Sequence, residues 1–156
     1  MKVCIIGNNL TSLTLAKALV NKEIFVDIFY KHKNINLDKT RTIGLSKSNI
    51  NFFNKSISNI NKILWPVKKI KIFSENSGNK EIIKFDDLHN NLFSIMSNYK
   101  VYTQLNSELY KNKYYNSKKN IPLKDLIKID YDLIINCDHT HEITKKFFFK
   151  KFEKKY

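Results

Sequence analysis

An apolar run that ends at a glycine constrains the fold of this chain most strongly. Lys2 to Ile6 is followed directly by Gly7, and it predicts a strand buried on both faces, as in a parallel sheet. Apolar residues then recur at helical spacing from Leu10 to Val20, and a second β-rich run extends from Ile24 to Tyr30. A strand, a helix and a strand over about 30 residues make a βαβ unit. The chain is therefore predicted to be an α/β protein.

The rest of the chain carries weaker patterns. Apolar spacing predicts a helix from Ser46 to Ile63, which Pro66 ends, and a second helix from Leu88 to Met96. Lys68–Phe73 and Lys80–Phe85 are predicted to form an antiparallel hairpin. Val101–Leu105 is predicted as a short strand, and Tyr131–Cys137 as a further parallel strand. Residues 31–42 and 106–124 are predicted to form loops, the latter with a hairpin as the alternative.

Composition narrows the class of protein. The 156 residues suit one domain, and a hydrophobic fraction of 42% predicts a globular fold. The formal charge is +14, but Arg41 is the only arginine among the 28 basic residues. We therefore interpret the charge as a solvated lysine surface rather than a nucleic-acid interface. Cys4 and Cys137 are too few for a disulfide framework, and no apolar run approaches about 18 residues, so we expect a reduced, cytoplasmic protein without a signal peptide or membrane span.

The turn after the first strand carries the candidate binding chemistry. Dinucleotide-binding Rossmann folds place a G-x-G-x-x-G turn there, so that the backbone and a helix N-terminus meet a pyrophosphate. Here the turn reads Gly7-Asn8-Asn9-Leu10-Thr11-Ser12, with one of the three glycines. Asn9 replaces the second glycine and Ser12 the third. Because asparagine tolerates a left-handed turn and serine is small, this segment still predicts a Rossmann-like parallel sheet.

Four segments together resemble one family. The segment from Ile5 to Leu19 is similar to the N-terminus of flavin-dependent aromatic hydroxylases, above all the ubiquinone-biosynthesis monooxygenases of the p-hydroxybenzoate hydroxylase-like fold family. Asp38 to Ser46 resembles the family's D-x-R-x-x-A-L-S segment. Trp65-Pro66-Val67 with the following hairpin resembles the region after it, and Tyr131 to Asp138 resembles its D-L-V-x-x-A-D-G strand.

The resemblance implies a site for the ADP half of FAD, with NAD(P)H as a candidate electron donor. The residues from Gly7 to Ser12 would face the pyrophosphate, Arg41 would lie near the flavin or the phosphates, and further contacts would come from Tyr30, Lys31 and Asp138. It implies a single FAD/NAD(P)-binding-like domain over residues 1–156, in which residues 66–105 form an inserted part of a substrate subdomain. The family continues well beyond this length, so the chain is expected to be either a fragment or truncated reading frame, or a protein that works with a companion polypeptide. No catalytic residue is predicted.

The chain also departs from the family. The acidic residue that holds the ribose should fall at Tyr30, and Asp27 lies three residues earlier, on the opposite face of the strand. The glycine after Asp138 is replaced by His139. A non-catalytic relative that acts through a partner is therefore the alternative, and a basic protein that binds a membrane surface or nucleic acid is the third hypothesis.

Two other segments admit competing interpretations. Cys137, His139 and His141 have the side chains of metal ligands, but the spacing indicates no fourth ligand, so we favour a strand end and a turn over a metal site. Residues 145–156 are almost all lysine, phenylalanine and tyrosine. We favour a segment that packs against missing partner surface, with peripheral contact at the inner membrane as the alternative.

Overall fold

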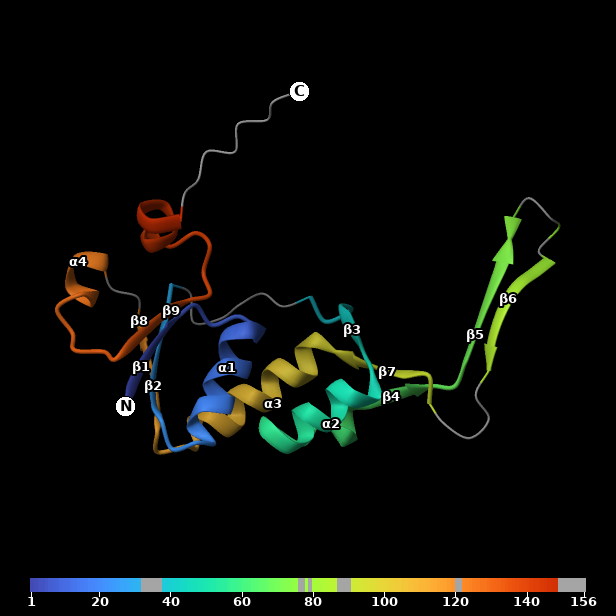
Figure 1. Ribbon diagram of the computed structural model, residues 1–156, viewed down its shortest axis with the longest axis horizontal. Coiled ribbons are helices and arrows are strands. Elements are labelled where there is room, and N and C mark those ends of the chain that lie inside the picture. Colours follow the sequence, from blue (N-terminus) through green and yellow to red (C-terminus); the bar gives the residue numbers. More distant parts are fainter. Residues whose placement is uncertain (32–37, 76–77, 79, 87–90, 120–121, 149–156) are drawn as a thin grey trace, which may run out of the picture. The chain divides into compact units, whose positions relative to one another are not determined.

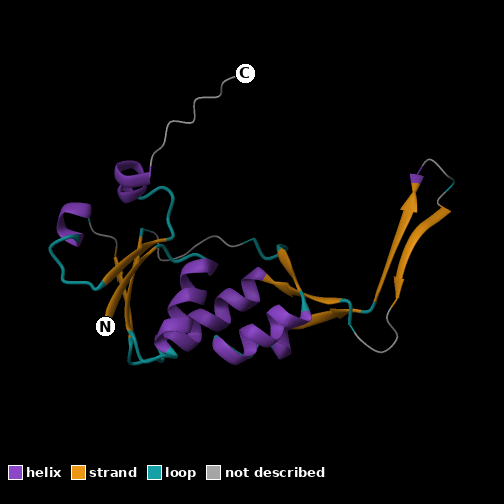
Figure 2. Cartoon of the chain, viewed as in Figure 1, coloured by secondary structure: helices purple, strands orange, loops and turns teal. Residues whose placement is uncertain are grey.

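The computed structural model describes residues 1–156 apart from 32–37, 76–77, 79, 87–90, 120–121 and 149–156 (Figure 1). The chain divides into two compact units, the first formed by residues 1–36 and 102–156 and the second by residues 37–101. Helices and strands occur in both units (Figure 2). The predicted α/β class is confirmed.

A four-stranded parallel sheet forms the centre of the first unit. Its order is β8 (Tyr115–Lys119), β2 (Phe25–Tyr30), β1 (Lys2–Ile6) and β9 (Leu133–Asn136). β1 pairs in parallel with β2 and β9, and β2 pairs in parallel with β8. The predicted parallel strands at the two ends of the chain are thus confirmed. β8 was not predicted, because its sequence, Tyr-Asn-Ser-Lys-Lys, has the polar character of an edge strand and lacks an apolar alternation.

Both faces of this sheet are covered at its two central strands, β1 and β2. Cys4, Ile6 and Phe29 pack with Leu123 and Leu126 of α4 (Leu123–Leu126). The alternate residues of β1 and β2 face the other way and are also buried. α1 (Leu10–Val20) packs against β1 and β2, and α3 (Asn98–Tyr110) lies beside it, joined by an ion pair of 3.3 Å between Lys17 and Glu108. In Figure 1, α1 and α4 lie on opposite faces of the sheet.

The predictions around residue 100 are wrong. The helix predicted from Leu88 to Met96 is instead strand β7 (Phe93–Ser97), while residues 88–90 of that prediction fall outside the described residues. The strand predicted from Val101 to Leu105 lies inside α3. Val101, Leu105 and Leu109 are all fully buried, and their spacing of four places them on one face of a helix. This longer helical stripe outweighs the local β propensity of its first residues.

The second unit contains a small antiparallel sheet of order β3 (Thr42–Leu45), β7, β4 (Leu64–Val67). The predicted helix from Ser46 to Ile63 is shorter: α2 spans Lys47–Ser56, with Ser46 as its N-cap, and a single 3₁₀ turn follows at Asn61–Ile63. Pro66 does not end that helix, because it lies within β4. β4 is an edge strand, where the missing N–H of proline is tolerated.

The predicted hairpin is confirmed as β5 (Lys69–Ser74) paired with β6 (Lys80–Asp86). Gly78 lies in its turn with a φ of 63°, a left-handed conformation that favours glycine. After β9, residues Thr144–Phe148 form one π-helical turn, and the rest of the aromatic tail falls outside the described residues. Within the described ranges, no helix is both long and apolar enough to cross a membrane.

Candidate functional site

The turn after β1 depends on the conformation of Gly7. Its φ is +107°, which side chains rarely allow, and its N–H donates to the Phe29 carbonyl at 2.7 Å. A Cβ built on Gly7 would lie 3.3 Å from Ser12 Oγ and 3.4 Å from the Asp138 backbone nitrogen. Gly7 therefore lets β1, α1 and the segment after β9 approach closely. The small, fully buried side chain of Ser12 contributes to the same packing.

Asn9 does not adopt the left-handed conformation that we expected. Its φ is −73° and its ψ is 176°, which is extended backbone, and it acts as the N-cap of α1. Asn9 Oδ1 accepts a hydrogen bond from the Ser12 N–H at 3.0 Å. Asn9 Nδ2 donates to the Cys137 carbonyl at 2.8 Å. The side chain that replaces the second glycine thus ties the start of α1 to the end of β9.

A cavity of about 440 Å³ opens beside this turn. It is lined by residues from three segments that follow strands: Gly7, Asn8, Asn9, Lys31, Cys137, Asp138, His139 and Thr140. In the sheet, β2 lies next to one edge of β1, and β9 lies next to the other edge of β1. The cavity therefore lies at the carboxyl ends of the strands, at the point where the strand order reverses, which is where open α/β sheets bind ligands.

The polar groups around this cavity suit an anion. By helix geometry, the N–H groups of Leu10 and Thr11 in the first turn of α1 have no acceptor within the helix. Lys31 adds a cation from the end of β2. Asp138 is the one carboxylate of the lining. Its Oδ1 accepts from both the N–H and the hydroxyl of Thr140 at 2.8 Å.

Asp138 is ionised at neutral pH. Burial would raise the pKa of Asp138, but the hydrogen bonds from Thr140 and the nearby His139 and His141 hold that pKa below its ordinary value. One carboxylate oxygen is thus already engaged by Thr140 rather than free to oppose an anionic ligand.

Most of the predicted cofactor contacts gather at this cavity. Five of them line it: Gly7, Asn8, Asn9, Lys31 and Asp138. Three more form the first turn of α1 next to it: Leu10, Thr11 and Ser12. Tyr30 is the last, half-buried residue of β2. Arg41 belongs to the second unit, where its carbonyl accepts from the Asn98 N–H at 3.0 Å, and its predicted role near the cofactor stays a prediction.

Thr140 also lines this cavity, although it was not among the residues predicted to form the site. A recognisable signal exists, because an Asp-x-Thr segment favours a turn in which the threonine donates to the aspartate. Asp38 and Thr40 form the same turn in the second unit, with the Thr40 N–H 2.8 Å from Asp38 Oδ1. The metal alternative gains no support, because in the described part of the chain no three His, Cys, Asp or Glu side chains come together to hold an ion.

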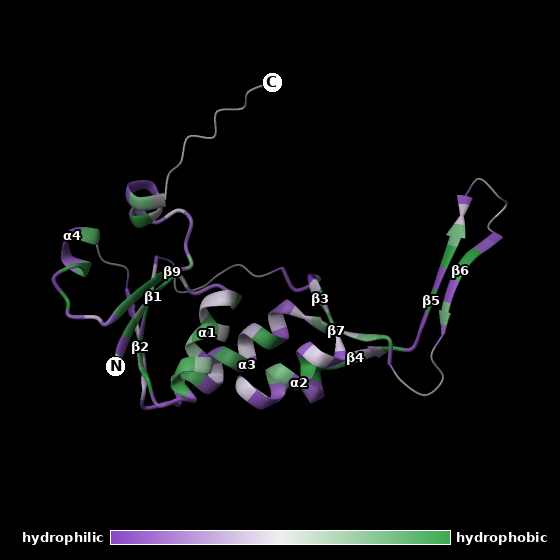
Figure 3. Ribbon diagram, in the orientation of Figure 1, coloured by the Kyte–Doolittle hydropathy of each residue, from purple (hydrophilic) through white to green (hydrophobic). Residues whose placement is uncertain are grey.

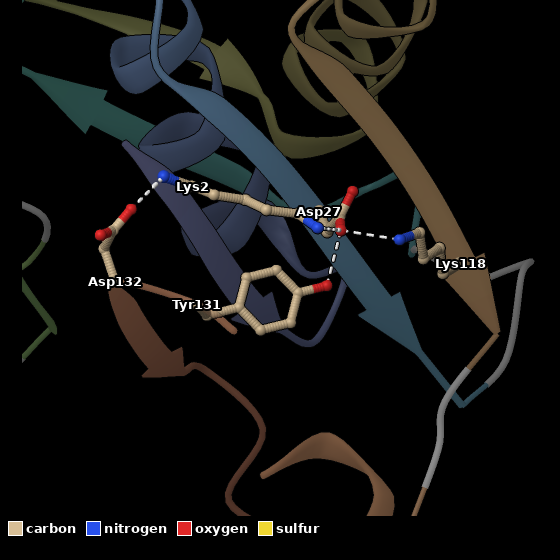
Figure 4. Close-up of polar contacts among 5 residues, drawn as sticks. All are labelled: Lys2, Asp27, Lys118, Tyr131 and Asp132. Carbon is tan, nitrogen blue, oxygen red and sulfur yellow. Dashed lines mark hydrogen bonds and ion pairs between the residues drawn. The ribbon is translucent and has the colours of Figure 1, made fainter. Parts of the chain in front are cut away.

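Asp27 lies at the centre of a different cluster (Figure 4). Its side chain is 8% exposed. Its Oδ2 accepts from Lys118 Nζ at 2.7 Å and from the Tyr131 hydroxyl at 2.6 Å. Lys2 Nζ lies 3.7 Å from the same oxygen, and the Lys2 backbone N–H donates to Asp132 at 2.6 Å. The cluster therefore links β1, β2, β8 and the segment that leads into β9.

The charge of Asp27 is stabilised within this cluster. Burial would raise the pKa of Asp27, but the hydrogen bonds from Lys118 and Tyr131, with the charges of Lys118 and Lys2, hold it below its ordinary value. Asp27 lies three residues before the end of β2 and is bonded to these groups, so it does not take the place of the ribose-binding acid. Tyr30 is the last residue of β2, and its predicted position beside the ribose stays a prediction.

Another cavity, of about 500 Å³, adjoins Asp27 at the amino-terminal ends of β1, β2 and β8. We assign less weight to it as a binding site, because ligands of parallel α/β sheets bind at the carboxyl ends of the strands. The smaller cavity beside Gly7 combines that location with a helix N-terminus and a lysine.

Comparison with solved structures finds this fold in flavin enzymes. The crystal structure of p-nitrophenol 4-monooxygenase PnpA from Pseudomonas putida matches 76% of this chain with a TM-score of 0.62 and 13% identity. Klebsiella pneumoniae HpxO complexed with FAD and uric acid matches 75% with a TM-score of 0.56 and 14% identity. PqsL from Pseudomonas aeruginosa, a probable FAD-dependent monooxygenase, matches 76% with a TM-score of 0.61 and 10% identity.

These matches establish the fold and its extent. The chain spans 31%, 30% and 32% of the lengths of those three structures, which is about a third of each. No protein-family profile matches the chain, and no curated protein matches it in sequence. The fold of FAD-dependent monooxygenases is thus shared over about three-quarters of this chain, at identities that show the fold alone.

Proposed function

We propose that this chain is an FAD-binding oxidoreductase domain of the monooxygenase type, and that it holds the ADP half of FAD in the cavity beside Gly7. One observation carries the proposal. The cavity lies where the strand order reverses, at the start of α1, in a fold shared with FAD-dependent monooxygenases.

The residues of the cavity fit the phosphate part of such a ligand. The N–H groups of Leu10 and Thr11 would face the pyrophosphate, and Lys31 would neutralise part of its charge. Gly7 permits the close approach of the backbone. The fit to the ribose is poorer, because Tyr30 stands at the position where an acidic residue would accept hydrogen bonds from the ribose hydroxyls. Bound FAD would supply the redox chemistry, while these residues would bind and orient it.

Several finer features belong to the proposal. The sequence resemblance favours the hydroxylases of ubiquinone biosynthesis, with NAD(P)H as the electron donor. The chain spans about a third of the matched structures, so the rest of the flavin and substrate sites would come either from further sequence of the same protein or from a companion polypeptide. We expect the protein in the cytoplasm, with residues 145–156 as a candidate for peripheral contact with the inner membrane.

A non-catalytic relative is the second candidate, and the geometry of Asn9 favours it. The Asn9 side chain bonds to the Cys137 carbonyl across the site, where a glycine would leave open space. If this side chain keeps phosphate away from the turn, the domain would retain the fold and lose the cofactor.

Titration of the purified chain with FAD separates the two candidates. We expect saturable binding at micromolar concentrations, seen as a change in flavin absorbance near 450 nm, with ADP competing and FMN not competing. Lys31→Glu should weaken binding about tenfold, equivalent to about 1.4 kcal/mol. Lys22→Glu makes the same charge change at an exposed residue after the other end of α1 and should leave binding unchanged. Absence of FAD and ADP binding by the folded protein would favour the non-catalytic relative.

A further inference from the structure

Between its base and the register shift after Ile72, the hairpin of β5 and β6 has one apolar face and one charged face. Cross-strand pairs Ile70 with Phe85 and Ile72 with Ile83 lie on the first face. The intervening pairs, Lys69 with Asp86 and Lys71 with Lys84, lie on the second. Figure 3 shows this mixture of apolar and polar residues along both strands. Such alternation is typical of a sheet that is covered on one face only.

That apolar face is exposed. Ile72 is 44% exposed, Ile83 is 44% exposed and Phe85 is 50% exposed. Every residue of β6 is exposed. A two-stranded sheet is marginally stable in water without a covering layer or further strands. The hairpin therefore has the apolar side chains of a sheet that packs against another layer, although these side chains are exposed here.

The edges of the hairpin are also open. β5 and β6 form a sheet of their own, and no other strand in the described ranges pairs with the outer edge of either. Neither strand contains proline, and both are rich in isoleucine and phenylalanine, which favour strands. Unpaired backbone N–H and C=O groups along such an edge are a template for an added strand.

The charges of the hairpin indicate which strand would fit. The two strands contain two acidic residues, Glu81 and Asp86, and four lysines: Lys69, Lys71, Lys80 and Lys84. The acidic residues are already paired, Glu81 with Lys71 and Asp86 with Lys84 at 3.1 Å. An incoming acidic residue would therefore meet unbalanced lysine charge. A second copy would bring the same lysine excess and a formal charge of +14, which opposes self-association.

We propose that the β5–β6 hairpin is a docking site for an extended segment of another polypeptide, which adds as a strand and alternates apolar with acidic residues. The apolar side chains of that segment would extend the face formed by Ile72, Ile83 and Phe85. Its acidic side chains would lie among the lysines of the opposite face. The proposal does not depend on cofactor binding, because the hairpin lies in the second unit and the Gly7 cavity in the first.

Three synthetic peptides test the proposal on the full chain: one that alternates glutamate with isoleucine, its lysine counterpart, and the acidic peptide with alternate backbone nitrogens methylated. The acidic peptide should bind saturably by fluorescence anisotropy. The other two should bind at least tenfold more weakly, because one reverses the charge and the other removes N–H donors to the edge. Hydrogen exchange should slow within residues 69–86 on addition of the acidic peptide.

Variants locate the contact. Ile83→Lys should weaken binding of the acidic peptide at least tenfold, whereas Phe52→Lys, at a residue of α2 that is 63% exposed, should not change it. Circular dichroism checks that both variants fold, and the exchange pattern supplies an independent readout in the unaltered chain. Equal binding of the methylated peptide would overturn strand addition. Self-association of the protein that Ile83→Lys abolishes would show that a second copy occupies the face, and would also overturn the proposal.

Discussion

The ion pair between Asp27 and Lys118 joins a buried carboxylate to a more exposed ammonium group, so removing either partner should have a different effect on stability. Asp27 is 8% exposed, whereas Lys118 is 38% exposed and can turn toward water. Replacing Asp27 by asparagine leaves a lysine that solvent can stabilise. Replacing Lys118 by methionine leaves a carboxylate in the protein interior with Tyr131 and a more distant Lys2. Lys118→Met should therefore destabilise the protein more than Asp27→Asn.

The contacts set the size of both effects. Asp27→Asn loses charge-assisted hydrogen bonds and should lower the free energy of unfolding by about 2 kcal/mol. Lys118→Met should lower it by about 3 kcal/mol, the low end of the range for a broken buried pair, because Lys2 remains and solvent screens the site. At roughly 2–4 °C per kcal/mol for a chain of this size, the melting temperature should fall by roughly 4–8 °C and 6–12 °C.

Urea denaturation followed by circular dichroism measures these differences. Asp125→Asn is the matched control, because it makes the same change in an exposed pair with Lys128 and should cost less than about 0.5 kcal/mol. The pKa of Asp27 is lower in the folded protein than its ordinary 3.8, so in acid the unfolded chain binds the proton first. The contribution of the Asp27 charge is therefore complete above pH 3.8 and is lost as the pH falls through the lower folded pKa. The difference in free energy of unfolding between the unaltered protein and Asp27→Asn should therefore become smaller as the pH is lowered over this range.

The opposite order of the two variants would refute this reasoning. If Asp27→Asn lowered the free energy of unfolding more than Lys118→Met, the lysine rather than the carboxylate would be the charge that is destabilised when its partner is removed. A cost for Asp27→Asn no larger than for Asp125→Asn would show that solvent screens the whole cluster.

Three further predictions concern the turn and the thiols. Gly7→Ala should destabilise the protein by about 2 kcal/mol in urea, because its φ of +107° and its neighbours at 3.3–3.4 Å both disfavour a Cβ; an unchanged midpoint would contradict this conformation. Asn9→Ala should cost about 1 kcal/mol through the lost N-cap, and a cost near zero would show that the cap does not form. At pH 8 a thiol reagent should modify half-buried Cys137 well before Cys4, since burial, with the negative charge of Asp27, raises the pKa of Cys4 to about 12; equal rates would contradict its burial.

The first unit was largely predictable because three of its strands are continuous apolar runs, two of which, β1 and β2, are buried on both faces. Continuous apolar runs identified β1, β2 and β9, and the glycine after β1 identified the start of α1. The polar edge strand β8 was missed for the opposite reason: its backbone pairs with β2, but its side chains carry no apolar pattern. Lys118, which lies in β8 and is the partner of Asp27, was missed as well. The two residues are 91 positions apart in the sequence, so their contact leaves no local signal.

The second unit was harder to predict because its elements are short and partly exposed. β7 resembles a helix in apolar content, although Ser94 and Met96 are buried in alternation along a strand. Pro66 is an ordinary helix terminator that an edge strand accommodates equally well. The site itself was predicted at Gly7, Asn8, Lys31 and Asp138, whereas the role of Asn9 as a cap required the geometry.

Backbone amide spectra of the ¹⁵N-labelled chain during titration with ADP test the central claim most directly. The account predicts saturable shifts at residues 7–11, at Lys31 and at residues 137–140, which surround the cavity at the carboxyl ends of the strands. The amides around the cavity at the amino ends, such as those of Tyr114 and Asn116, should not move. Shifts confined to that second cavity, or no shifts with ADP in excess, would contradict the assignment of the Gly7 turn as a dinucleotide site.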